Sequence, residues 1–449
     1  MKKRLHFIGI GGISMSGLAE ILHKNGHIVS GSDDTESEIT RHLSKLGINI
    51  SIPNAAENIT DDIETVIYTA AVKPQNPEFS AAKQKGIIMT ERAELLGELL
   101  KDYDYPICIA GTHGKTTTTS FMAEVVIAAG LNPTISIGGH MGFDGSNYRV
   151  GGLEYFILEA CEYSNSFHHW HPQVGIILNI DADHLDFFGN MEGVVSAFRK
   201  FAENIRPGGV LVVQVGQRLV TAGLQCKIVT FGLTNQARYW PHDVEYDKLG
   251  RPSFDVMDGE RVLGRISLPM PGEYNMLNAV ACFAAAVEMG INNEIITHAL
   301  SKAKGVKRRF EHKGKLGSID IIDDYAHHPT EIEACLKAAK KTGRRVVCVF
   351  QPHTYSRTKN HLDQFALTLA KADVTILLPI YPAREPFDET ISSLMLTNLI
   401  GGNAIHLESF DAAQTYLHKS LVPGDLLITM GAGDVYKLGE ALLTSKLST

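Results

Sequence analysis

The stretch Ile107–Thr117 reads ICIAGTHGKTT and passes from an apolar run through a glycine-bearing loop into a helical pattern. A loop between a strand and a helix is the usual setting of a phosphate site, where backbone N–H groups and the helix N-terminus meet an anion. Lys115 can neutralise the β- and γ-phosphate charge of a nucleotide, and a hydroxyl of Thr116 or Thr117 can bind Mg²⁺. We therefore predict a nucleotide-binding loop made of Gly111, Thr112, His113, Gly114, Lys115, Thr116 and Thr117.

This loop departs from the usual Walker pattern, G-x-x-x-x-G-K-[ST], at its first position. The pattern requires glycine at position 109, where this chain has Ile109. The departure argues against a generic GTPase or nucleotide kinase. An ordinary glycine turn before a helix is the alternative interpretation.

Outward from the loop, strand-like apolar runs alternate with helical patterns along most of the chain. That alternation predicts an α/β protein with largely parallel sheets. At about 150 residues per domain, 449 residues suggest roughly three domains. One break is expected at the polar stretch Lys101–Pro106, and another near Arg308.

Composition excludes some classes of function. Acidic residues outnumber basic ones by 50 to 42, so the formal charge of −8 gives no support for a nucleic-acid binder. No apolar run reaches the roughly 18 residues of a membrane-spanning helix, and the N-terminal MKKRLHFIGIGG reads as a strand rather than a signal peptide. Six scattered cysteines without a C-x-x-C pair predict buried thiols in a reducing compartment, which points to the cytoplasm.

The N-terminal motif GIGGISMSG, residues 9–17, is similar to a dinucleotide fingerprint. A strict G-x-G-x-x-G fails because Ser14 stands at the third glycine position, although Asp33 falls near the expected ribose-binding position. Amides of such a turn could approach a diphosphate, either of NAD or of a nucleotide sugar. A glycine turn without a ligand is the alternative.

Two candidate metal ligands, Glu159 and His184, follow apolar strands. Because the carboxyl ends of parallel strands form the ligand crevice, they could complete Mg²⁺ coordination around ATP phosphates. The alternative is that Asp181, Asp183 and Asp186 cap a helix and that His184 is a turn residue.

Later polar motifs are each open to two interpretations. Asn275 and Asn278 share a helical face and could contact nucleotide, although the local pattern favours helix capping. The pair Arg308-Arg309 could reach a phosphate from a neighbouring domain or be surface charge.

Two further motifs follow apolar strands. DDYAHHPTE, residues 323–331, combines acids and histidines at a strand end, which favours a site over a core, although Pro329 and Glu331 are also helix-start signals. FQPHTYSRT, residues 350–358, could bind a small carboxylate through Arg357 or be an exposed polar loop.

Taken together, the motifs resemble the Mur ligases of peptidoglycan synthesis. The matching motifs, from near residue 8 to near residue 440, are GIGGISMSG, SGSD, GTHGKTTTT, NIDADHLD, NMLNA, KRRFE, DDYAHHPTE, FQPHTYSRT and GAGDVYKLGE. The resemblance implies three domains: residues 1–104, a Rossmann-like UDP-sugar-binding domain; 105–308, a central P-loop-type ATP-binding α/β domain; and 309–449, a Rossmann-like amino-acid-binding domain.

Position by position, the resemblance implies a set of site residues. Catalytic roles fall to Lys115, Glu159, His184 and Arg309. ATP is bound by the loop at 111–117 together with Asn275, Asn278, Arg309 and Asp324. Mg²⁺ is held by Thr116, Thr117, Glu159 and His184. The amino-acid substrate is bound by His353, Tyr355 and Arg357. The UDP-sugar surface comprises Gly11, Gly12, Ser14, Asp33, Thr69 and Ala70. Departures from the common family pattern occur at Cys161, Tyr163 and Tyr274.

The implied reaction is ATP-dependent joining of L-alanine to the lactyl carboxylate of UDP-N-acetylmuramate through an acyl phosphate. The proton acceptor is left open among His184, His327 and His328. The nearest alternative is a ligase that recycles murein tripeptide onto the same UDP-sugar. More distant alternatives are an NAD(P)-dependent oxidoreductase and a non-catalytic UDP-sugar-binding regulator. We expect small-molecule substrates, no nucleic acid and no membrane insertion, and a homodimer is left open.

Overall fold

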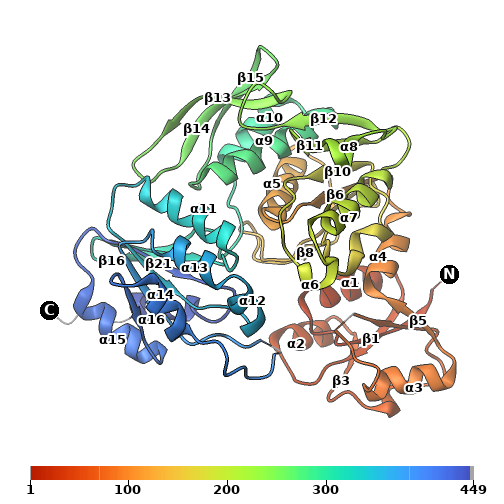
Figure 1. The fold of residues 1–449 in the computed structure, drawn as a ribbon. Helices are drawn as coiled ribbons and strands as arrows, with labels where there is room; N and C mark the ends of the chain where they lie inside the picture. The colour runs from red at the N-terminus through yellow and green to blue at the C-terminus, as the bar shows by residue number, and fades with distance from the viewer. Residues whose placement is uncertain (1, 70, 384, 445–449) are drawn as a thin grey trace. The chain divides into compact units, whose positions relative to one another are not determined.

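The computed structural model describes residues 2–69, 71–383 and 385–444. The chain divides into two compact units. The first comprises Met1–Pro241, Val256–Gly264 and Leu277–Ala303, and the second comprises His242–Asp255, Arg265–Met276 and Lys304–Thr449. Sheets of five, ten and six strands follow one another along the chain, with helices between most of their strands (Figure 1). The α/β prediction is therefore confirmed.

The N-terminal sheet has the strand order β3-β2-β1-β4-β5, and its neighbouring strands pair in parallel. This is the order of the first five strands of a Rossmann sheet, whose ligand crevice lies beyond the carboxyl ends of the strands. Its elements are β1 (Arg4–Ile8), α1 (Ile13–Lys24), β2 (Ile28–Ser32), α2 (Glu38–Lys45), β3 (Asn49–Ser51), η1 (Ala56–Asn58), β4 (Thr65–Tyr68), α3 (Pro77–Lys85), β5 (Ile88–Glu91) and α4 (Arg92–Leu100).

The central sheet has the order β15-β14-β13-β12-β11-β10-β6-β9-β7-β8. Its strands are β6 (Tyr105–Ala110), β7 (Thr134–Ser136), β8 (Tyr148–Arg149), β9 (Tyr155–Glu159), β10 (Val174–Ile177), β11 (Val210–Gln214), β12 (Lys227–Phe231), β13 (Tyr239–Tyr246), β14 (Pro252–Asp258) and β15 (Arg261–Ser267). Its helices are α5 (Lys115–Ala128), η2 (Tyr163–His169), α6 (Leu185–Phe188), α7 (Met191–Glu203), α8 (Arg218–Thr221), α9 (Glu273–Glu288) and α10 (Asn293–Ser301).

The C-terminal sheet has the order β16-β17-β21-β18-β19-β20, and all its neighbouring strands are parallel except the β16–β17 pair. Its strands are β16 (Glu311–Leu316), β17 (Ile319–Asp324), β18 (Val346–Phe350), β19 (Val374–Leu377), β20 (Ala404–His406) and β21 (Leu426–Met430). Its helices are α11 (Pro329–Lys340), α12 (Tyr355–Asn360), α13 (Leu362–Leu369), α14 (Ser393–Ile400), α15 (Phe410–Ser420) and α16 (Tyr436–Thr444).

Burial explains why the central strands read as continuous apolar runs. Every residue of β10, β18 and β21 is buried. A parallel strand covered by helices on both faces has no solvent side on which to place alternating polar residues. Apolar clusters on the two faces of the C-terminal sheet supply its core.

The polar stretch at 101–106, where a domain break was expected, is packed against its neighbours, and its last two residues already belong to β6. Tyr103 is buried, its ring meets Phe156 edge-on at 4.8 Å, and its hydroxyl donates to Thr134 Oγ1 at 3.2 Å. One apolar cluster joins residues of the first and second sheets. Trp170 Nε1 adds a hydrogen bond to the carbonyl of Ala93 at 3.0 Å. Residues 1–104 and most of the predicted central domain accordingly fall in one compact unit, whereas His242–Asp255, Arg265–Met276 and the residues from Lys304 onward fall in the other. The two predicted domain boundaries stay predictions.

Two sequence expectations concern whole-chain properties. No helix in the described ranges is both long and apolar enough to cross a bilayer. All six cysteines, which lie within those ranges, are free thiols.

Candidate active site

The order of the central strands brings three predicted site segments to one edge of the sheet. Strand β6 lies between β9 and β10, with Ile109 paired to Glu159 and Ala110 paired to Ile177. Because all three strands run in parallel, the loop after β6, the carboxylate at the end of β9 and the segment after β10 emerge together. This edge is where a parallel sheet binds ligands.

Two positions of the loop after β6 require glycine. Gly111 has φ +144°, and a Cβ there would lie 2.9 Å from Leu178 Cβ. Gly114 has φ +86°, and its Cβ would lie 2.6 Å from Asn278 Oδ1. The loop thus runs close to the neighbouring strand end and to α9, in a conformation that residues with a side chain rarely adopt.

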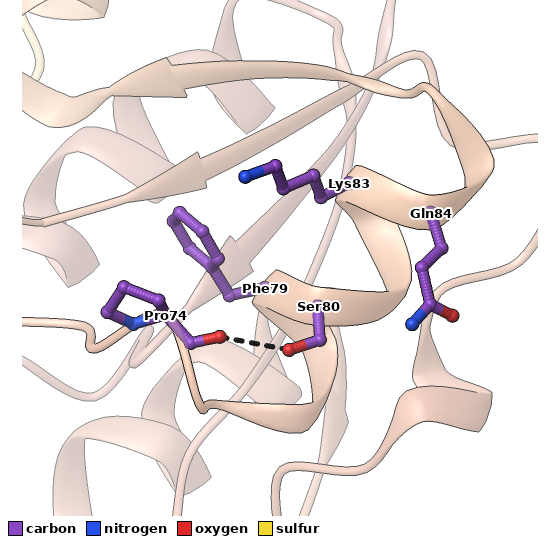
Figure 2. A pocket seen from close by; sticks show the side chains of 5 residues that line it. All are labelled: Pro74, Phe79, Ser80, Lys83 and Gln84. Atoms are coloured by element: carbon purple, nitrogen blue, oxygen red, sulfur yellow. Dashed lines mark hydrogen bonds between the residues drawn. The ribbon is translucent and has the colours of Figure 1, made fainter.

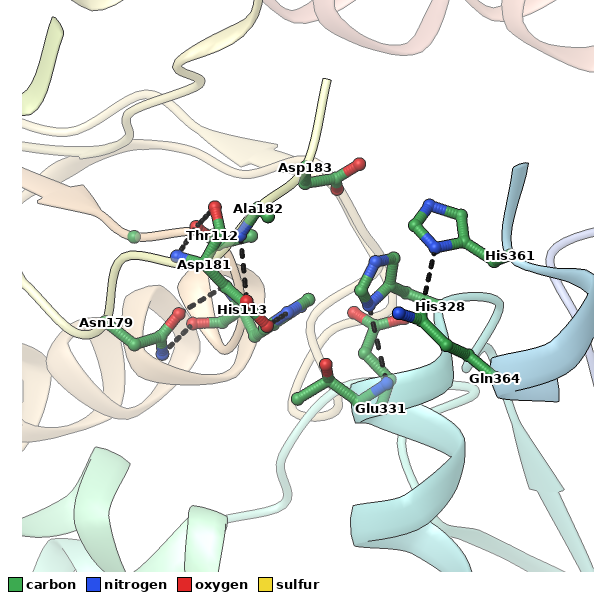
Figure 3. A network of polar contacts seen from close by, with 12 residues as sticks. Thr112, His113, Asn179, Asp181, Ala182, Asp183, His328, Glu331, His361 and Gln364 are labelled. Carbon is green, nitrogen blue, oxygen red and sulfur yellow. Dashed lines mark hydrogen bonds and ion pairs between the residues drawn. The ribbon is translucent and has the colours of Figure 1, made fainter. Parts of the chain in front are cut away.

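The segment after β10 is hydrogen-bonded to this loop. His113 N–H donates to Asn179 Oδ1 at 2.8 Å, and Asn179 Nδ2 donates back to the His113 carbonyl at 2.9 Å (Figure 3). Thr112 Oγ1 accepts from Asp181 N–H at 2.9 Å, and His113 Nε2 lies 3.3 Å from Asp181 Oδ2. Asn179 therefore fixes the loop backbone. The sequence signal for this role was an asparagine directly after a buried strand.

Lys115 is held in place before any substrate binds. Its ammonium donates to the carbonyls of Gly111 at 2.6 Å and Thr112 at 3.0 Å, and it pairs with Glu162 Oε2 at 2.9 Å. The side chains of Lys115 and Glu162 are 14% and 3% exposed. Burial opposes the charged ammonium, but the Glu162 carboxylate outweighs that effect, so the pKa of Lys115 lies above its usual value. Lys115 is positively charged at neutral pH.

Thr116 and Glu159 form an oxygen-rich corner beside Lys115. Thr116 Oγ1 donates to Glu159 Oε1 at 2.9 Å, and Gly138 N–H donates to Glu159 Oε2 at 2.7 Å. A hydroxyl beside a carboxylate is a donor set that Mg²⁺ accepts. Of the two predicted threonines, Thr116 therefore makes the contact with Glu159, and Thr117 is buried in the first turn of α5.

His184 lies in the turn that precedes α6 and has φ +52°. Its ring lies 4.9 Å from that of Tyr163, which follows β9, so the loops on both sides of β6 meet there. Asp183 Oδ1 accepts from His184 N–H and Asp181 Oδ1 from Ala182 N–H, each at 2.8 Å. Both acids thus bind the N–H group of the next residue in tight turns. The side chain of Asp186 lies outside the described part of the chain.

At the N-terminal sheet, the glycine turn and Asp33 are in direct contact. Gly11 N–H donates to Asp33 Oδ2 at 2.9 Å, and a Cβ on Gly11 would lie 2.7 Å from that oxygen. Strands β1, β2 and β4 are neighbours, so the segment Gly11–Ser14, Asp33 and Thr69 share one edge of the sheet. Thr69 Oγ1 accepts from the next described N–H, that of residue 71, at 3.3 Å. Ala70 lies outside the described residues.

A separate hollow of about 340 Å³ lies beside α3 (Figure 2). It is lined by Pro74, Phe79, Ser80, Lys83 and Gln84, and Ser80 Oγ donates to the Pro74 carbonyl at 2.9 Å. The sequence motifs single out none of these residues.

The two asparagines of NMLNA are not helix caps. Helix α9 begins at Glu273, so both residues lie inside it. Asn275 Nδ2 donates to the Pro271 carbonyl at 2.7 Å and closes the first turn. Asn278 is buried against Gly114 of the loop, and its Nδ2 has no hydrogen-bond partner among the described residues.

In the second unit, Asp324 binds the backbone around Arg309. Asp324 Oδ2 accepts from Phe310 N–H and Oδ1 from Ala326 N–H, both at 2.7 Å. Burial raises the pKa of Asp324 to about 6, although Arg309 and the two N–H donors favour the carboxylate. The Arg309 guanidinium lies 5.3 Å from the ring centroid of Tyr325.

His353, Tyr355 and Arg357 gather at the carboxyl end of β18 and the start of α12. The His353 ring stacks on Tyr381 with centroids 5.6 Å apart, and Arg357 Nη1 donates to His353 Nδ1 at 3.4 Å. Burial, reinforced by the charges of His327 and Arg357, lowers the pKa of His353 to about 4. His353 is therefore neutral at physiological pH and can accept the hydrogen bond that orients Arg357.

Comparison with known proteins identifies the family. Three family models match in succession: Mur ligase family, catalytic domain, at residues 4–104; Mur ligase middle domain at 109–286; and Mur ligase, glutamate ligase domain, at 308–433. The UDP-N-acetylmuramate–L-alanine ligase of Agathobacter rectalis is 48% identical over 98% of this chain and 97% of that protein. The ligase of the same name from Clostridium novyi is 46% identical over 99% and 98%. The chain belongs to the Mur ligase family.

Solved structures agree with the fold of this Mur ligase. The UDP-N-acetylmuramate–alanine ligase of Thermotoga maritima superposes with a TM-score of 0.82 at 30% identity, covering 98% of each chain. A murein peptide ligase of Psychrobacter arcticus shares the fold with a TM-score of 0.72 at 24% identity, covering 100% of this chain and 99% of that one. The family and the α/β fold predicted from the motifs are confirmed.

Sequence reasoning passed over three residues that this Mur ligase uses to hold its predicted site. Glu162 pairs with Lys115, Gly138 with Glu159, and Asn179 with His113. Glu162 has a weak sequence signal, because it is the second acid of the motif LEACE, residues 158–162. The contact between Gly138 and Glu159 has no sequence signal, because only the pairing of strands β7 and β9 brings these two residues together.

Proposed function

We propose that the chain is an ATP-dependent ligase that joins L-alanine to the lactyl carboxylate of UDP-N-acetylmuramate, the first amino-acid addition in peptidoglycan precursor synthesis. The observation that carries the proposal is Lys115, fixed between two loop carbonyls and Glu162 at the strand edge where Thr116 meets Glu159. The substrates are those named for relatives that are 42–48% identical over nearly the full chain.

The residues at this edge fit ATP and Mg²⁺. Glycine amides of the loop and the N-terminus of α5 suit phosphate oxygens, and the buried Nδ2 of Asn278 is a further donor beside Gly114. Thr116, Glu159 and His184 would hold Mg²⁺, with Thr117 as the alternative hydroxyl. When bound, Mg²⁺ screens the phosphate charge and polarises the transferring group.

The chemistry follows from the weakness of a carboxylate as an acyl donor. A lactyl carboxylate oxygen attacks the γ-phosphorus of ATP, ADP leaves, and an acyl phosphate forms. The amine of L-alanine then attacks the acyl carbon, and the tetrahedral intermediate expels inorganic phosphate. Negative charge grows on phosphoryl oxygens in the first step and on the carbonyl oxygen in the second. Lys115 and Arg309 are proposed to stabilise it.

His327 is the proton acceptor that we favour in the second unit. Its Nδ1 lies 3.0 Å from the Tyr325 carbonyl, which can only accept, so Nδ1 carries the proton and Nε2 keeps its lone pair. Burial lowers the pKa of His327 below its usual value, against the attraction of Glu331. His328, by contrast, uses its Nδ1 lone pair to cap α11 through Thr330 N–H at 3.4 Å.

Substrate recognition is assigned to two further groups. Arg357, oriented by neutral His353, is proposed to bind the carboxylate of L-alanine, with Tyr355 at the start of α12 as a further contact. The amides of the turn Gly11–Ser14, together with Asp33 and Thr69, are proposed to bind the UDP-sugar. Asp33 already accepts from one such amide. The free thiols and the ATP requirement suit the cytoplasm as the compartment.

A phosphate-release assay separates this function from its nearest alternative. The enzyme is given ATP, Mg²⁺ and UDP-N-acetylmuramate with L-alanine, glycine, L-serine or murein tripeptide. We expect the highest kcat/KM with L-alanine, the amino acid that the names of the relatives specify. Faster release with tripeptide would move the chain to the recycling ligases, and release that needs no UDP-sugar would refute both assignments.

A further inference from the structure

The adjacent arginines of KRRFE have different surroundings. Arg308 Nε donates to Asp323 Oδ2 at 3.0 Å, and its Nη2 donates to the Gly431 carbonyl at 2.6 Å. Its guanidinium carbon lies 4.9 Å from the ring centroid of Tyr325 and 4.6 Å from that of Tyr436. We call these four partners, Asp323, Gly431, Tyr325 and Tyr436, the Arg308 clamp. The guanidinium therefore lies over two aromatic rings and donates two hydrogen bonds.

Asp323 anchors the clamp within the sheet. It is fully buried at the carboxyl end of β17, and Thr429 Oγ1 of the adjacent β21 donates to its second oxygen at 2.7 Å. A carboxylate so placed is costly without a counter-charge, which Arg308 supplies. The pair therefore ties the residue before Arg309 to the middle of the C-terminal sheet.

The backbone on both sides of Arg309 is strained. Arg308 has φ +63° and Phe310 has φ +50°, in the left-handed region that residues with a Cβ avoid. Such conformations persist only where the surroundings over-determine them, and they concentrate at functional sites. The segment 308–310 is thus a turn whose shape is imposed from outside.

Three backbone contacts, besides the clamp, impose that shape. Arg308 N–H donates to Glu311 Oε2 at 2.8 Å, and the Arg308 carbonyl accepts from Tyr325 N–H at 2.7 Å. Phe310 N–H donates to Asp324 Oδ2 at 2.7 Å. The backbone is fixed on each side of Arg309, so the direction in which that side chain leaves the turn is set by its neighbours.

We propose that Arg308 is a positioning residue: through its clamp it holds the strained turn that aims Arg309 at the reacting phosphate. This inference rests on the proposed function, in which Arg309 stabilises charge during phosphoryl transfer. A lysine at 308 keeps the charge facing Asp323, but it lacks the planar guanidinium that lies over two rings and reaches a second acceptor.

The central test is Arg308→Lys, compared with Arg344→Lys as a matched control. Arg344 is 19% exposed against 21% for Arg308, pairs with buried Asp320, and donates to the Gly424 carbonyl at 2.7 Å. Asp320 lies near the start of β17 and Asp323 near its carboxyl end. We expect similar losses of thermal stability. For Arg308→Lys alone we expect kcat to fall by roughly 10²-fold with less than a threefold change in the KM for ATP, since a misdirected group loses its effect on the transition state.

A double-substitution cycle tests whether Arg308 acts through Arg309. If it does, Arg308→Lys lowers kcat in the wild-type background and changes it little in an Arg309→Lys background. Tyr436→Leu offers a milder variant, which removes one of the two rings of the clamp and should lower kcat by about three- to tenfold. The proposal would be overturned if the fold-loss of kcat in the double variant equalled the product of the fold-losses in the two single variants. Equal kcat values for Arg308→Lys and Arg344→Lys would also overturn it.

These outcomes are distinct from a failure of the proposed function. A wild-type enzyme that releases no phosphate with ATP, UDP-N-acetylmuramate and L-alanine refutes that function and this proposal with it. An active wild type whose kcat survives Arg308→Lys refutes the positioning role alone.

Discussion

Two glycines at the ends of helix α5 allow a sharp test of the nucleotide loop. Gly114 precedes the helix with φ +86°, and Gly130 follows it with φ +78°. Alanine at either position must take a left-handed conformation, at a cost of about 1–2 kcal/mol. The surroundings differ: a Cβ on Gly114 meets Asn278 Oδ1 at 2.6 Å and Nδ2 at 3.0 Å, whereas no described atom lies within 4 Å of a Cβ on Gly130.

The perturbation is therefore Gly114→Ala, with Gly130→Ala as its control. The strain alone should lower the midpoint of thermal unfolding by about 2–8 °C in each variant. Gly114→Ala must also displace either Asn278 or the loop by several tenths of an ångström or more. This displacement falls at the start of α5, where Lys115 and the backbone amides proposed to bind phosphate lie. Misplacement on this scale costs up to about 10²-fold in rate.

Both variants would be measured by differential scanning fluorimetry without ligand and by phosphate release with saturating substrates. We expect comparable losses of stability, near-normal turnover for Gly130→Ala, and turnover lowered by about 10²-fold for Gly114→Ala. Normal turnover of a folded Gly114→Ala enzyme would refute the assignment of this loop to ATP. Equal losses of turnover in the two variants would show that strain in α5, rather than the loop, controls activity.

Four other outcomes are expected. Lys115→Ala should abolish ATP-dependent phosphate release and leave the circular-dichroism spectrum unchanged. Near-normal phosphate release would refute the assignment of Lys115 to the ATP phosphates. Glu162→Gln should destabilise the free enzyme by about 3 kcal/mol because it leaves the buried ammonium of Lys115 without a counter-charge. The rise in unfolding temperature on adding Mg·ATP should then be larger for this variant than for the wild type. Because the pKa of Asp324 is raised to about 6, protonation stabilises the fold, and the wild type should gain about 2 kcal/mol over Asp324→Asn as pH falls from 6 to 4. A pH-independent difference in unfolding midpoint contradicts this. Because the pKa of His353 is lowered to about 4, the wild type should lose stability between pH 6.5 and 4 relative to His353→Asn, measured in the same titration.

The fold was predictable where burial and backbone geometry leave one choice. Strands β18 and β21, VVCVF and LLITM, are buried on both faces, so only a helix-covered parallel sheet accommodates them. Gly111 and Gly114 lie where a side chain would collide or strain the backbone. Periodicity and glycine spacing record such constraints directly in the sequence.

The fine structure of the site was less predictable because it depends on neighbours across the sheet. Lys115 and Glu162 are 47 residues apart and meet because β6 and β9 are adjacent. The motif RRF contains two arginines with equal local signals, and only the fold shows that Arg308 lies over two tyrosine rings and pairs with the buried Asp323. Asp324 was predicted as a nucleotide contact; here both of its oxygens accept from backbone N–H groups, so whether it also meets ATP stays a prediction.

Net charge is a poor guide to the ligands of this chain because its key cations are paired before substrates arrive. Lys115 has Glu162, and Arg308 has Asp323, each carboxylate buried and close to its cation. These pairs prevent uncompensated charge in the free fold and keep each cation in one direction. In the proposed role of Lys115, an incoming phosphate would gain only the difference between its own attraction and that of Glu162. That exchange would limit the ground-state affinity for ATP and leave the ammonium available to the larger charge of the transition state, which is the distribution of binding energy that favours turnover.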